Sequence, residues 1–381
     1  MDTRDSKYMR RALELAQESL GLASPNPPVG CVIVQGDTIV GEGFHVYPAR
    51  DHAEIRALAA AGDRARGASV YLTLEPCVHH GRTPPCTSAL IEAGVGRIVV
   101  AHPDPNPIVS GRGIGQIHAA GIEVGSGLLQ AEAARIIEPF ACHVTTGLPL
   151  VVGKVGMSLD GKIAPAGGRD AWITSEQGRS FGQQLRLQLD AIMVGIGTVL
   201  ADNPQLTYRG ELQKARPLRV IVLDSFLRTP LDARLLHAVP EPRVLIFCAP
   251  DAAAGRKREL ESRGAEIVPA MRGEHGLDLI QVLRELGARE ILGLLVEGGS
   301  EIHWSFLSSA LVDKFFFIVS PLVLGGRKAV PAVGGTGYSS VTAAPRFRIA
   351  DVTHAGPDTI LEAYPTNSKS ILSPWLANST S

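Results

Sequence analysis

The chain has 381 residues, more than one hydrophobic core usually serves, and a typical domain of about 150 residues predicts two domains. Hydrophobic residues make up 45% of the chain and charged residues 20%, which excludes an intrinsically disordered protein. The formal net charge of −1 gives no overall attraction to nucleic acid or to an anionic membrane, so small-molecule partners are favoured.

The cysteines and the N-terminus bear on the compartment. Five cysteines form a sparse, odd set, unlike the dense, even sets of secreted disulfide proteins. The first residues lack the apolar core of a signal peptide, and no segment approaches the roughly 20 apolar residues that cross a bilayer. We therefore expect a cytoplasmic protein that is neither exported nor embedded in a membrane.

The first part of the chain alternates helix and strand patterns. Apolar residues recur every three or four positions between residues 5 and 20, which predicts an amphipathic helix. Strands are expected at 29–34, 39–40, 69–74 and 97–101, and further helices at 52–61, 88–93 and 128–140. This alternation predicts an α/β domain with helices packed on a sheet.

A break rich in Thr, Gly and Pro near Gly147 predicts a boundary between domains at residues 1–147 and 148–365. Beyond it, strands at 150–155, 191–194, 218–223, 244–248 and 291–296 alternate with helices at 176–188, 277–286 and 301–311. Late strands are expected at 313–319, 346–352 and 359–364. The order predicts a second, Rossmann-like α/β domain, and we expect the Asn- and Ser-rich residues 366–381 to be a mobile tail.

One histidine and two cysteines have the spacing of a catalytic zinc site. His52 opens a predicted helix, while Cys77 and Cys86 each follow a proline and are separated by eight residues. One imidazole and two thiolates supply three ligands and leave a fourth position for water. Glu54 follows the histidine by two residues and can move a proton from that water to a leaving amine. We predict one zinc in the first domain, rather than a buried histidine with two structural thiols.

The pattern of these four residues is the signature of zinc nucleobase deaminases, with a longer second spacing. The segments PNPPVGCVIV, DHAEIRAL, VYLTLEPCVHHGRTPPCTSALIEAGV and DPNPIVSGRGI resemble the deaminase half of the bifunctional diaminohydroxyphosphoribosylaminopyrimidine deaminase and aminouracil reductase family. The resemblance implies a cytidine-deaminase-like α/β/α domain. It implies substrate contacts at Asn26, Arg82, Asp104 and Asn106, with the alternative that Arg82 is only a solvated loop charge.

The second part of the chain resembles the reductase half of the same family. The segments KVGMSLDGKIA, AWITSEQGR, GIGTVLADNPQLTYR, RPLRVIVLDS and LLVEGGSEIHWSFL occur in that order. The resemblance implies a fold similar to dihydrofolate reductase and NADPH as the cofactor. The implied cofactor contacts are Gly156, Trp172, Thr198, Asp202, Ser225, Gly299, Ser300, Glu301, Ile302, His303, Trp304 and Ser305. The implied substrate contacts are Asp170, Arg186, Leu206, Arg209 and Glu297.

Physical reasoning supports several of these contacts. Glycine turns at 195–197 and 298–299 each follow an apolar strand and open a helix, so that backbone N–H groups can approach a pyrophosphate. Arg186 and Arg209 are suitable phosphate clamps, with surface charge as the alternative, and Lys154 is a possible catalytic aid. Trp172 is equally consistent with a core residue.

The cofactor preference is not settled by these patterns. Asp224 ends a predicted strand and resembles the acidic residue that favours NAD in Rossmann domains. Ser225, by contrast, can bind a 2′-phosphate. We favour NADPH.

The resemblance, which covers both halves of the chain, implies a bifunctional enzyme of riboflavin biosynthesis. It would deaminate 2,5-diamino-6-(phosphoribosylamino)pyrimidin-4-one with zinc, and then reduce the ribosyl group of 5-amino-6-(5-phosphoribosylamino)uracil to a ribityl chain with NADPH. A deaminase with an inactive reductase-like domain is the alternative. A nucleic-acid-binding protein is disfavoured, because aromatic residues are only 5% of the chain. The resemblance also implies a homo-oligomer.

Overall fold

A computed structural model describes residues 3–47, 49, 51–78, 85–168, 172–238 and 243–366. Contacts divide the chain into a first compact unit that ends at Gly147 and a second that comprises Leu148–Gln213 and continues from Pro217. Residues 367–381 of the predicted tail lie outside the described residues, as do Arg82 and Asp170. Within the described ranges, none of the helices is long and apolar enough to span a bilayer.

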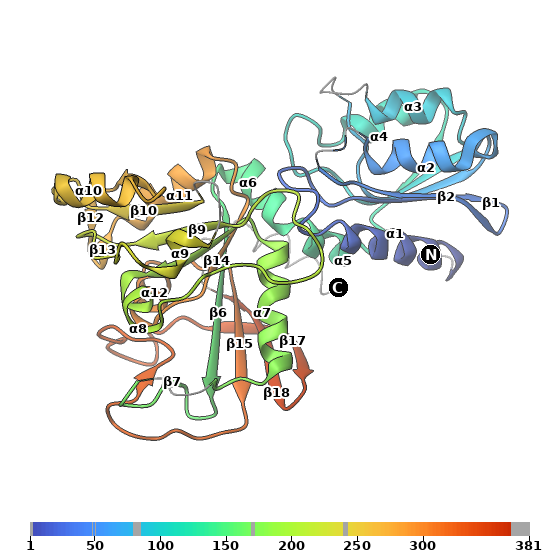
Figure 1. The fold of residues 1–381 in the computed structure, drawn as a ribbon. Coiled ribbons are helices and arrows are strands. Elements are labelled where there is room, and N and C mark those ends of the chain that lie inside the picture. Colours follow the sequence, from blue (N-terminus) through green and yellow to red (C-terminus); the bar gives the residue numbers. More distant parts are fainter. Residues whose placement is uncertain are drawn as a thin grey trace. The chain divides into compact units, whose positions relative to one another are not determined.

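The first unit is built on a sheet with the strand order β2-β1-β3-β4-β5 (Figure 1). β1 pairs antiparallel with β2 and β3, whereas β3, β4 and β5 are parallel. Gly36 turns the β1–β2 hairpin with a left-handed φ of 60°. The strands are β1 (Gly30–Gln35), β2 (Thr38–Phe44), β3 (Ser69–Leu74), β4 (Arg97–His102) and β5 (Glu123–Ser126).

Helices cover both faces of this sheet, because successive strand residues point to opposite sides. Cys31 and Ile33 pack toward α2 (Ala53–Ala61), α3 (Cys86–Glu92) and α4 (Arg112–Ala119). Val32 and Val34 pack toward α1 (Thr3–Glu18) and α5 (Gln130–Ile136). The short helix η1 (Gly62–Ala65) follows α2. The predicted α/β/α architecture is confirmed.

The helix predicted at 128–140 is in fact two helices, and that prediction was wrong. α5 stops at Ile136, and α6 (Glu138–Thr146) begins after Ile137, whose ψ of 8° departs from the helical value. Pro139 stands in the first turn of α6, where its missing N–H costs no hydrogen bond. α6 ends at Gly147, which has a left-handed φ of 73°.

The second unit contains a larger sheet with the order β11-β10-β9-β8-β14-β6-β15-β18-β17. Neighbouring strands run parallel from β11 to β15, and β18 and β17 add an antiparallel edge. The strands are β6 (Leu150–Ser158), β8 (Ala191–Gly195), β9 (Arg219–Leu223), β10 (Val244–Cys248), β11 (Glu266–Pro269), β14 (Gly293–Val296), β15 (Lys314–Ser320), β17 (Phe347–Ala355) and β18 (Asp358–Pro365). Short pairs join β7 (Lys162–Ala164) to β16 (Val330–Pro331) and β12 (Arg272–Gly273) to β13 (Gly276–Leu277).

Separate apolar clusters line the two faces of this sheet. Ile192 and Val194 belong to one cluster, while Ala191 and Met193 belong to the other. The helices are α7 (Glu176–Gln188), α8 (Ile196–Asp202), α9 (Arg234–His237), α10 (Ala254–Glu261), α11 (Leu279–Ala288) and α12 (Ser300–Ser308). Because α8 and α12 follow the adjacent strands β8 and β14, their N-termini meet at the same sheet edge.

Candidate active sites

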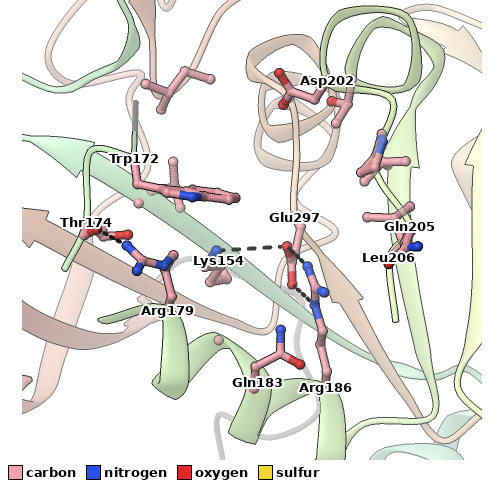
Figure 2. Close-up of a pocket in the computed structure, with 18 of the residues that line it drawn as sticks. Lys154, Trp172, Thr174, Arg179, Gln183, Arg186, Asp202, Gln205, Leu206 and Glu297 are labelled. Carbon is pink, nitrogen blue, oxygen red and sulfur yellow. Dashed lines mark hydrogen bonds and ion pairs between the residues drawn. The ribbon is translucent and has the colours of Figure 1, made fainter. Parts of the chain in front are cut away.

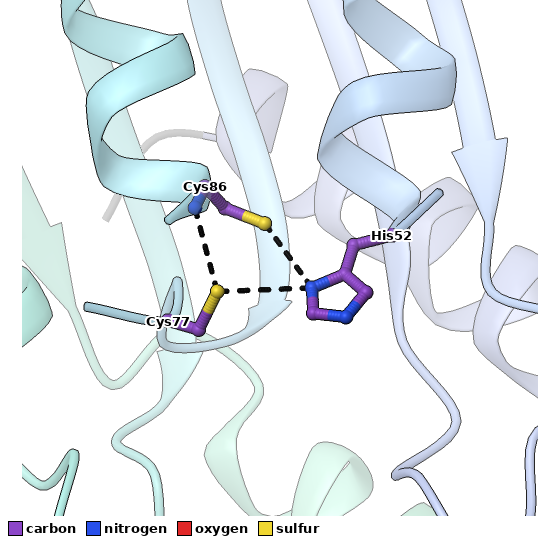
Figure 3. A group of neighbouring side chains, drawn as sticks. All are labelled: His52, Cys77 and Cys86. Atoms are coloured by element: carbon purple, nitrogen blue, oxygen red, sulfur yellow. Dashed lines mark hydrogen bonds between the residues drawn. The ribbon is translucent and has the colours of Figure 1, made fainter. Parts of the chain in front are cut away.

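In the first unit, His52 and the two predicted cysteine ligands come together from three separate segments (Figure 3). His52 is the N-cap residue of α2, and Cys86 is the first residue of α3. Cys77 lies in the segment that follows β3. Their ligand atoms all lie within 4.8 Å of one another.

The distances fit a tetrahedral zinc ion. His52 Nδ1 lies 3.2 Å from Cys86 Sγ and 3.7 Å from Cys77 Sγ. Zinc bonds of about 2.1 Å to nitrogen and about 2.3 Å to sulfur place such atoms about 3.6 Å apart in a tetrahedron. The Cys86 backbone N–H also donates to Cys77 Sγ at 3.4 Å. Hydrogen bonds from Cys86 and His52 hold the pKa of the Cys77 thiol well below its usual range, while the hydrogen bond to Cys77 and burial raise the pKa of the Cys86 thiol. The protein by itself therefore favours one thiolate of the pair, at Cys77.

Glu54 lies in the first turn of α2 and is only 4% exposed. Burial raises the pKa of its carboxyl group. The side chain is electrostatically coupled to His52 and Cys77, so it belongs to the same site without being one of the three clustered ligands. This arrangement suits a group that exchanges protons beside a metal.

The predicted substrate residue Asn26 contacts a histidine that sequence reasoning missed. Asn26 Nδ2 lies 2.9 Å from His45 Nε2, and His45 Nδ1 lies 3.1 Å from the carbonyl oxygen of Asp51. A neutral ring that donates through Nδ1 accepts the Asn26 amide at Nε2, and burial lowers the pKa of His45. Its ring meets that of His52 edge-on, with the centroids 5.3 Å apart. A lone histidine after β2 carries no motif that would have revealed it.

Asp104 and Asn106 lie on one loop after β4. Asp104 Oδ1 accepts from the Asn106 N–H at 2.8 Å, and Asn106 Oδ1 accepts from the Ile108 N–H at 3.1 Å. Asp104 is 8% exposed, and its own N–H donates to Glu75 Oε2. The loop is therefore ordered by its own side chains and by a carboxylate from the neighbouring strand.

The second unit contains a cavity of about 300 Å³, lined by the middle of β6 and by residues at the ends of β8 and β14 (Figure 2). The two predicted glycine turns meet here, since the Gly195 N–H donates to the Gly298 carbonyl at 3.1 Å. The predicted residues that line the cavity are Lys154, Gly156, Trp172, Arg186, Thr198, Asp202, Leu206, Arg209, Glu297, Gly299 and His303.

A buried ion-pair network forms one wall of this cavity. Arg186 Nε and Nη2 each donate to a different oxygen of Glu297 at 2.8 Å. Lys154 Nζ lies 3.9 Å from Glu297 Oε2. Although burial opposes it, the charges of Lys154 and Arg186 hold the pKa of Glu297 at about 2. Figure 2 shows Lys154 and Arg186 reaching Glu297 from different segments.

The two arginines that were predicted to bind phosphate differ in how far the protein already engages them. Besides Glu297, Arg186 donates from Nη1 to the Thr207 carbonyl at 2.9 Å, so at least three of its five N–H groups are already engaged within the protein. Arg209 lines the cavity from an exposed position, and in the described part of the chain its guanidinium forms no ion pair.

Trp172 is not a core residue. It is 62% exposed and borders the cavity, so the alternative reading of it as core was wrong. The Arg179 guanidinium lies 5.4 Å from its ring centroid and donates to the Thr174 carbonyl at 2.8 Å. A flat aromatic face held by a cation is a suitable surface for a planar ring.

Asp224 does not have the position of a ribose-binding acid. It is fully buried, and its Oδ2 accepts from the N–H and the hydroxyl of Thr229 at 2.7 and 2.8 Å. Its role is to close the turn after β9. The apparent signal for NAD at this position was therefore wrong, while Ser225 beside it is half-buried.

Other predicted cofactor residues lie outside the lining of this cavity. Glu301 accepts from the Gly335 N–H, Trp304 packs edge-on against Tyr338, and Ser305 donates to the Glu301 carbonyl. The full set outside the lining is Ser225, Ser300, Glu301, Ile302, Trp304 and Ser305. Conversely, Gln183 and Arg234 line the cavity although no sequence motif marks them, and Arg179 lines it from the end of the segment AWITSEQGR without having been predicted as a contact.

Comparisons with known proteins match both units of the chain. The RibD C-terminal domain model matches residues 149–361, and the model of the cytidine and deoxycytidylate deaminase zinc-binding region matches residues 2–102. The riboflavin biosynthesis protein RibD of Actinobacillus pleuropneumoniae is 41% identical over 358 residues, which cover 94% of both chains. RibD of Escherichia coli strain K12 is 39% identical over 373 residues, covering 94% of this chain and 98% of that protein.

Solved structures show the same similarity. Acinetobacter baumannii RibD has 36% identity and a TM-score of 0.85, with 96% of this chain and 99% of that chain covered. The diaminohydroxyphosphoribosylaminopyrimidine deaminase/5-amino-6-(5-phosphoribosylamino)uracil reductase of Thermotoga maritima has 35% identity and a TM-score of 0.82, with coverage of 95% and 99%.

Proposed function

The chain belongs to the RibD family of bifunctional riboflavin biosynthesis enzymes, and from this premise we propose how its two units divide the deaminase and reductase chemistry. The first unit deaminates 2,5-diamino-6-(phosphoribosylamino)pyrimidin-4-one, and the second reduces the ribosyl group of the resulting uracil to a ribityl chain. The observation that carries this assignment is the His52, Cys77 and Cys86 cluster with Glu54 beside it.

In the first unit, His52, Cys77 and Cys86 would hold zinc. Bound there, zinc supplies the Lewis acidity that makes a water molecule nucleophilic near neutral pH. Glu54 takes the proton of the attacking water and transfers it to the amine that leaves as ammonia. Asn26, oriented by His45, binds the pyrimidine edge, and Asp104 with Asn106 binds substrate hydroxyls.

In the second unit, the cavity would bind NADPH and the deaminated product side by side. NADPH supplies the hydride for the sugar carbon C1′. Arg209 holds the substrate phosphate at the cavity rim, and Glu297 is fixed by Arg186 and Lys154 so that it can accept substrate hydroxyls. Lys154 is the nearest candidate to supply a proton as the sugar ring opens.

We extend the proposal to assembly and compartment. Reduced cysteines support a cytoplasmic location, because the five cysteines of the structure are all free. The edge strand β17 exposes Ile349 and Val352, which supports a homo-oligomer formed through the second unit. Light scattering of the purified chain tests the oligomer, and a monomer at micromolar concentration would contradict it.

The two activities can be tested in one preparation. The zinc-loaded protein is incubated with the diaminopyrimidine ribosyl phosphate, and ammonia release is followed together with the loss of NADPH absorbance. A Glu54→Ala variant should release no ammonia but should still oxidise NADPH when supplied with the deaminated intermediate. Ammonia release without any NADPH oxidation would leave a deaminase with an inactive second unit.

A further inference from the structure

Glu75 is a buried carboxylate that the proposed chemistry does not use. It directly follows β3 and precedes Pro76 and the zinc ligand Cys77, and it is only 4% exposed. Among the described residues it forms no ion pair with an arginine, lysine or histidine. A buried carboxylate without such a partner must be satisfied by hydrogen-bond donors.

Three backbone N–H groups supply those donors. Glu75 Oε2 accepts from Asp104 at 3.0 Å and from Gly111 at 2.9 Å, and Oε1 accepts from Ile114 at 3.0 Å. Gly111 is the N-cap residue of α4, whose N-terminus has no side-chain cap of its own. Glu75 therefore caps α4 from a different element, where the positive end of the helix dipole also favours its charge.

The first turn of α4 packs closely against residues 75 and 76. A Cβ atom on Gly113 would lie 2.2 Å from the Pro76 carbonyl oxygen and 3.0 Å from Glu75 Cγ. The first turn of α4 is thus in direct contact with the segment that leads into the zinc ligand. Thr87, next to Cys86, also donates to Gln116 of α4 at 2.6 Å, so α4 is tied beside both cysteines.

The same carboxylate fixes the loop that carries Asp104 and Asn106. Glu75 holds the Asp104 backbone, and Asp104 in turn accepts from the Asn106 N–H. The Glu75 N–H donates to the His102 carbonyl at 3.0 Å, which joins the two strand ends from which the loop and the zinc-ligand segment depart. Glu75 therefore links the two segments through its backbone at the strand ends and through its carboxylate at the loop and α4.

We propose that Glu75 is a positioning residue of the deaminase site, which holds the Asp104–Asn106 loop at a fixed distance from the segment carrying Cys77. The inference rests on the proposed function, because that function makes Asp104 and Asn106 substrate contacts. Glu75 acts through backbone amides and does not touch the substrate.

The test compares Glu75→Gln with wild type in the full-length, zinc-loaded protein. Glutamine has one acceptor oxygen and one NH2 group where glutamate has two acceptor oxygens. At least one of the three backbone N–H groups therefore loses its partner. We expect the KM for the diaminopyrimidine ribosyl phosphate to rise about ten- to a hundredfold. Zinc content and the reductase activity on the deaminated intermediate should stay at wild-type values. Glu92→Gln removes the same charge at an exposed position of α3 and should leave KM unchanged.

A double-mutant cycle separates positioning from general destabilisation. In an Asp104→Ala background, Glu75→Gln should add less than about a twofold further rise in KM, because the two residues act through one loop. Fully multiplicative effects, or a loss of zinc in Glu75→Gln that parallels the loss of activity, would overturn the proposal.

Hydrogen exchange provides a readout that does not depend on turnover. The peptide covering residues 103–115 should exchange faster in Glu75→Gln, while peptides of α2 and of the second unit stay unchanged. Unchanged exchange in 103–115 would overturn the role of Glu75. If wild type released no ammonia, the proposed function would fail, and the exchange result would still decide whether Glu75 holds the loop.

Discussion

The two candidate sites differ in whether the protein itself compensates their polar groups. In the first unit, an imidazole and two thiols converge as electron-pair donors, a set that gains its full stability only with a cation. In the second unit, Glu297 lies between Arg186 and Lys154, so the polar wall of the cavity is neutralised by the protein itself. The first site is therefore designed around a resident metal, whereas the second is assembled before its ligands bind.

This difference predicts where each site is sensitive. Substitutions in the first site should remove chemistry without unfolding the unit, provided that the three ligands remain. Substitutions in the buried ion-pair wall of the second site should cost both stability and activity, because breaking a buried ion pair leaves a charge without a partner.

The largest expected effect concerns Glu54. Glu54→Gln keeps the shape of the side chain but removes its ability to take a proton, so ammonia release should fall by about 10²- to 10⁴-fold. Zinc content, reductase activity and the unfolding midpoint should change little. A fall of less than tenfold would show that another group moves the proton, and would weaken the contrast between the two sites.

The next effect concerns the ion-pair wall of the second site. Glu297→Gln should reduce the free energy of unfolding of the second unit by about 3–5 kcal/mol, because Arg186 loses its bidentate partner in a buried position. Tryptophan fluorescence in a Trp375→Phe background reports on this unit through Trp172 and Trp304.

The exposed pair between Glu285 and Arg289 provides the control for that substitution. Its glutamate side chain is 40% exposed, so Glu285→Gln should cost less than about 1 kcal/mol. If Glu297→Gln and Glu285→Gln lowered the free energy of unfolding equally, burial would not strengthen the Glu297 ion pairs.

Protonation of Glu297 at low pH should lower the free energy of unfolding slightly less than the substitution Glu297→Gln does. The pKa of Glu297 falls from 4.5 to about 2 on folding, so its contribution is fully present above about pH 4.5 and is lost as the pH falls toward 2. The difference corresponds to about 3 kcal/mol. Unfolding by urea between pH 6 and pH 2 should therefore show a steeper loss of stability in wild type than in Glu297→Gln. Parallel curves would contradict the assigned pKa.

The smallest effect concerns the rim of the reductase cavity. Arg179→Ala removes the cation that holds the exposed Trp172 ring, and the KM for NADPH should rise about two- to fivefold. Deaminase activity and the unfolding midpoint should not change. An unchanged KM for NADPH, with Trp172→Ala also without effect, would remove Trp172 from the cofactor site.

Several features follow directly from local sequence. The ranges 69–74, 176–188 and 244–248 were predicted with the observed bounds, because each is a continuous apolar run or a clear helical stripe. The cluster of His52, Cys77 and Cys86, with Glu54 near it, could be anticipated because these residues lie in short motifs at or near element ends. By contrast, α10 escaped prediction because its sequence AGRKRELE has almost no apolar residues to form a stripe.

Tertiary structure alone decided the contacts between residues far apart in the sequence. Glu297 and Arg186 are separated by 111 positions. They meet only because α7, which carries Arg186, packs against β14, which Glu297 directly follows. Asp224 looked like a ribose ligand until the turn to Thr229 showed it to be buried. Sequence records residue types and local spacing, which suffice for a metal site made of short motifs. Side-chain direction and burial depend on packing between distant elements, so the reductase wall and the role of Glu75 could be found only in the folded chain.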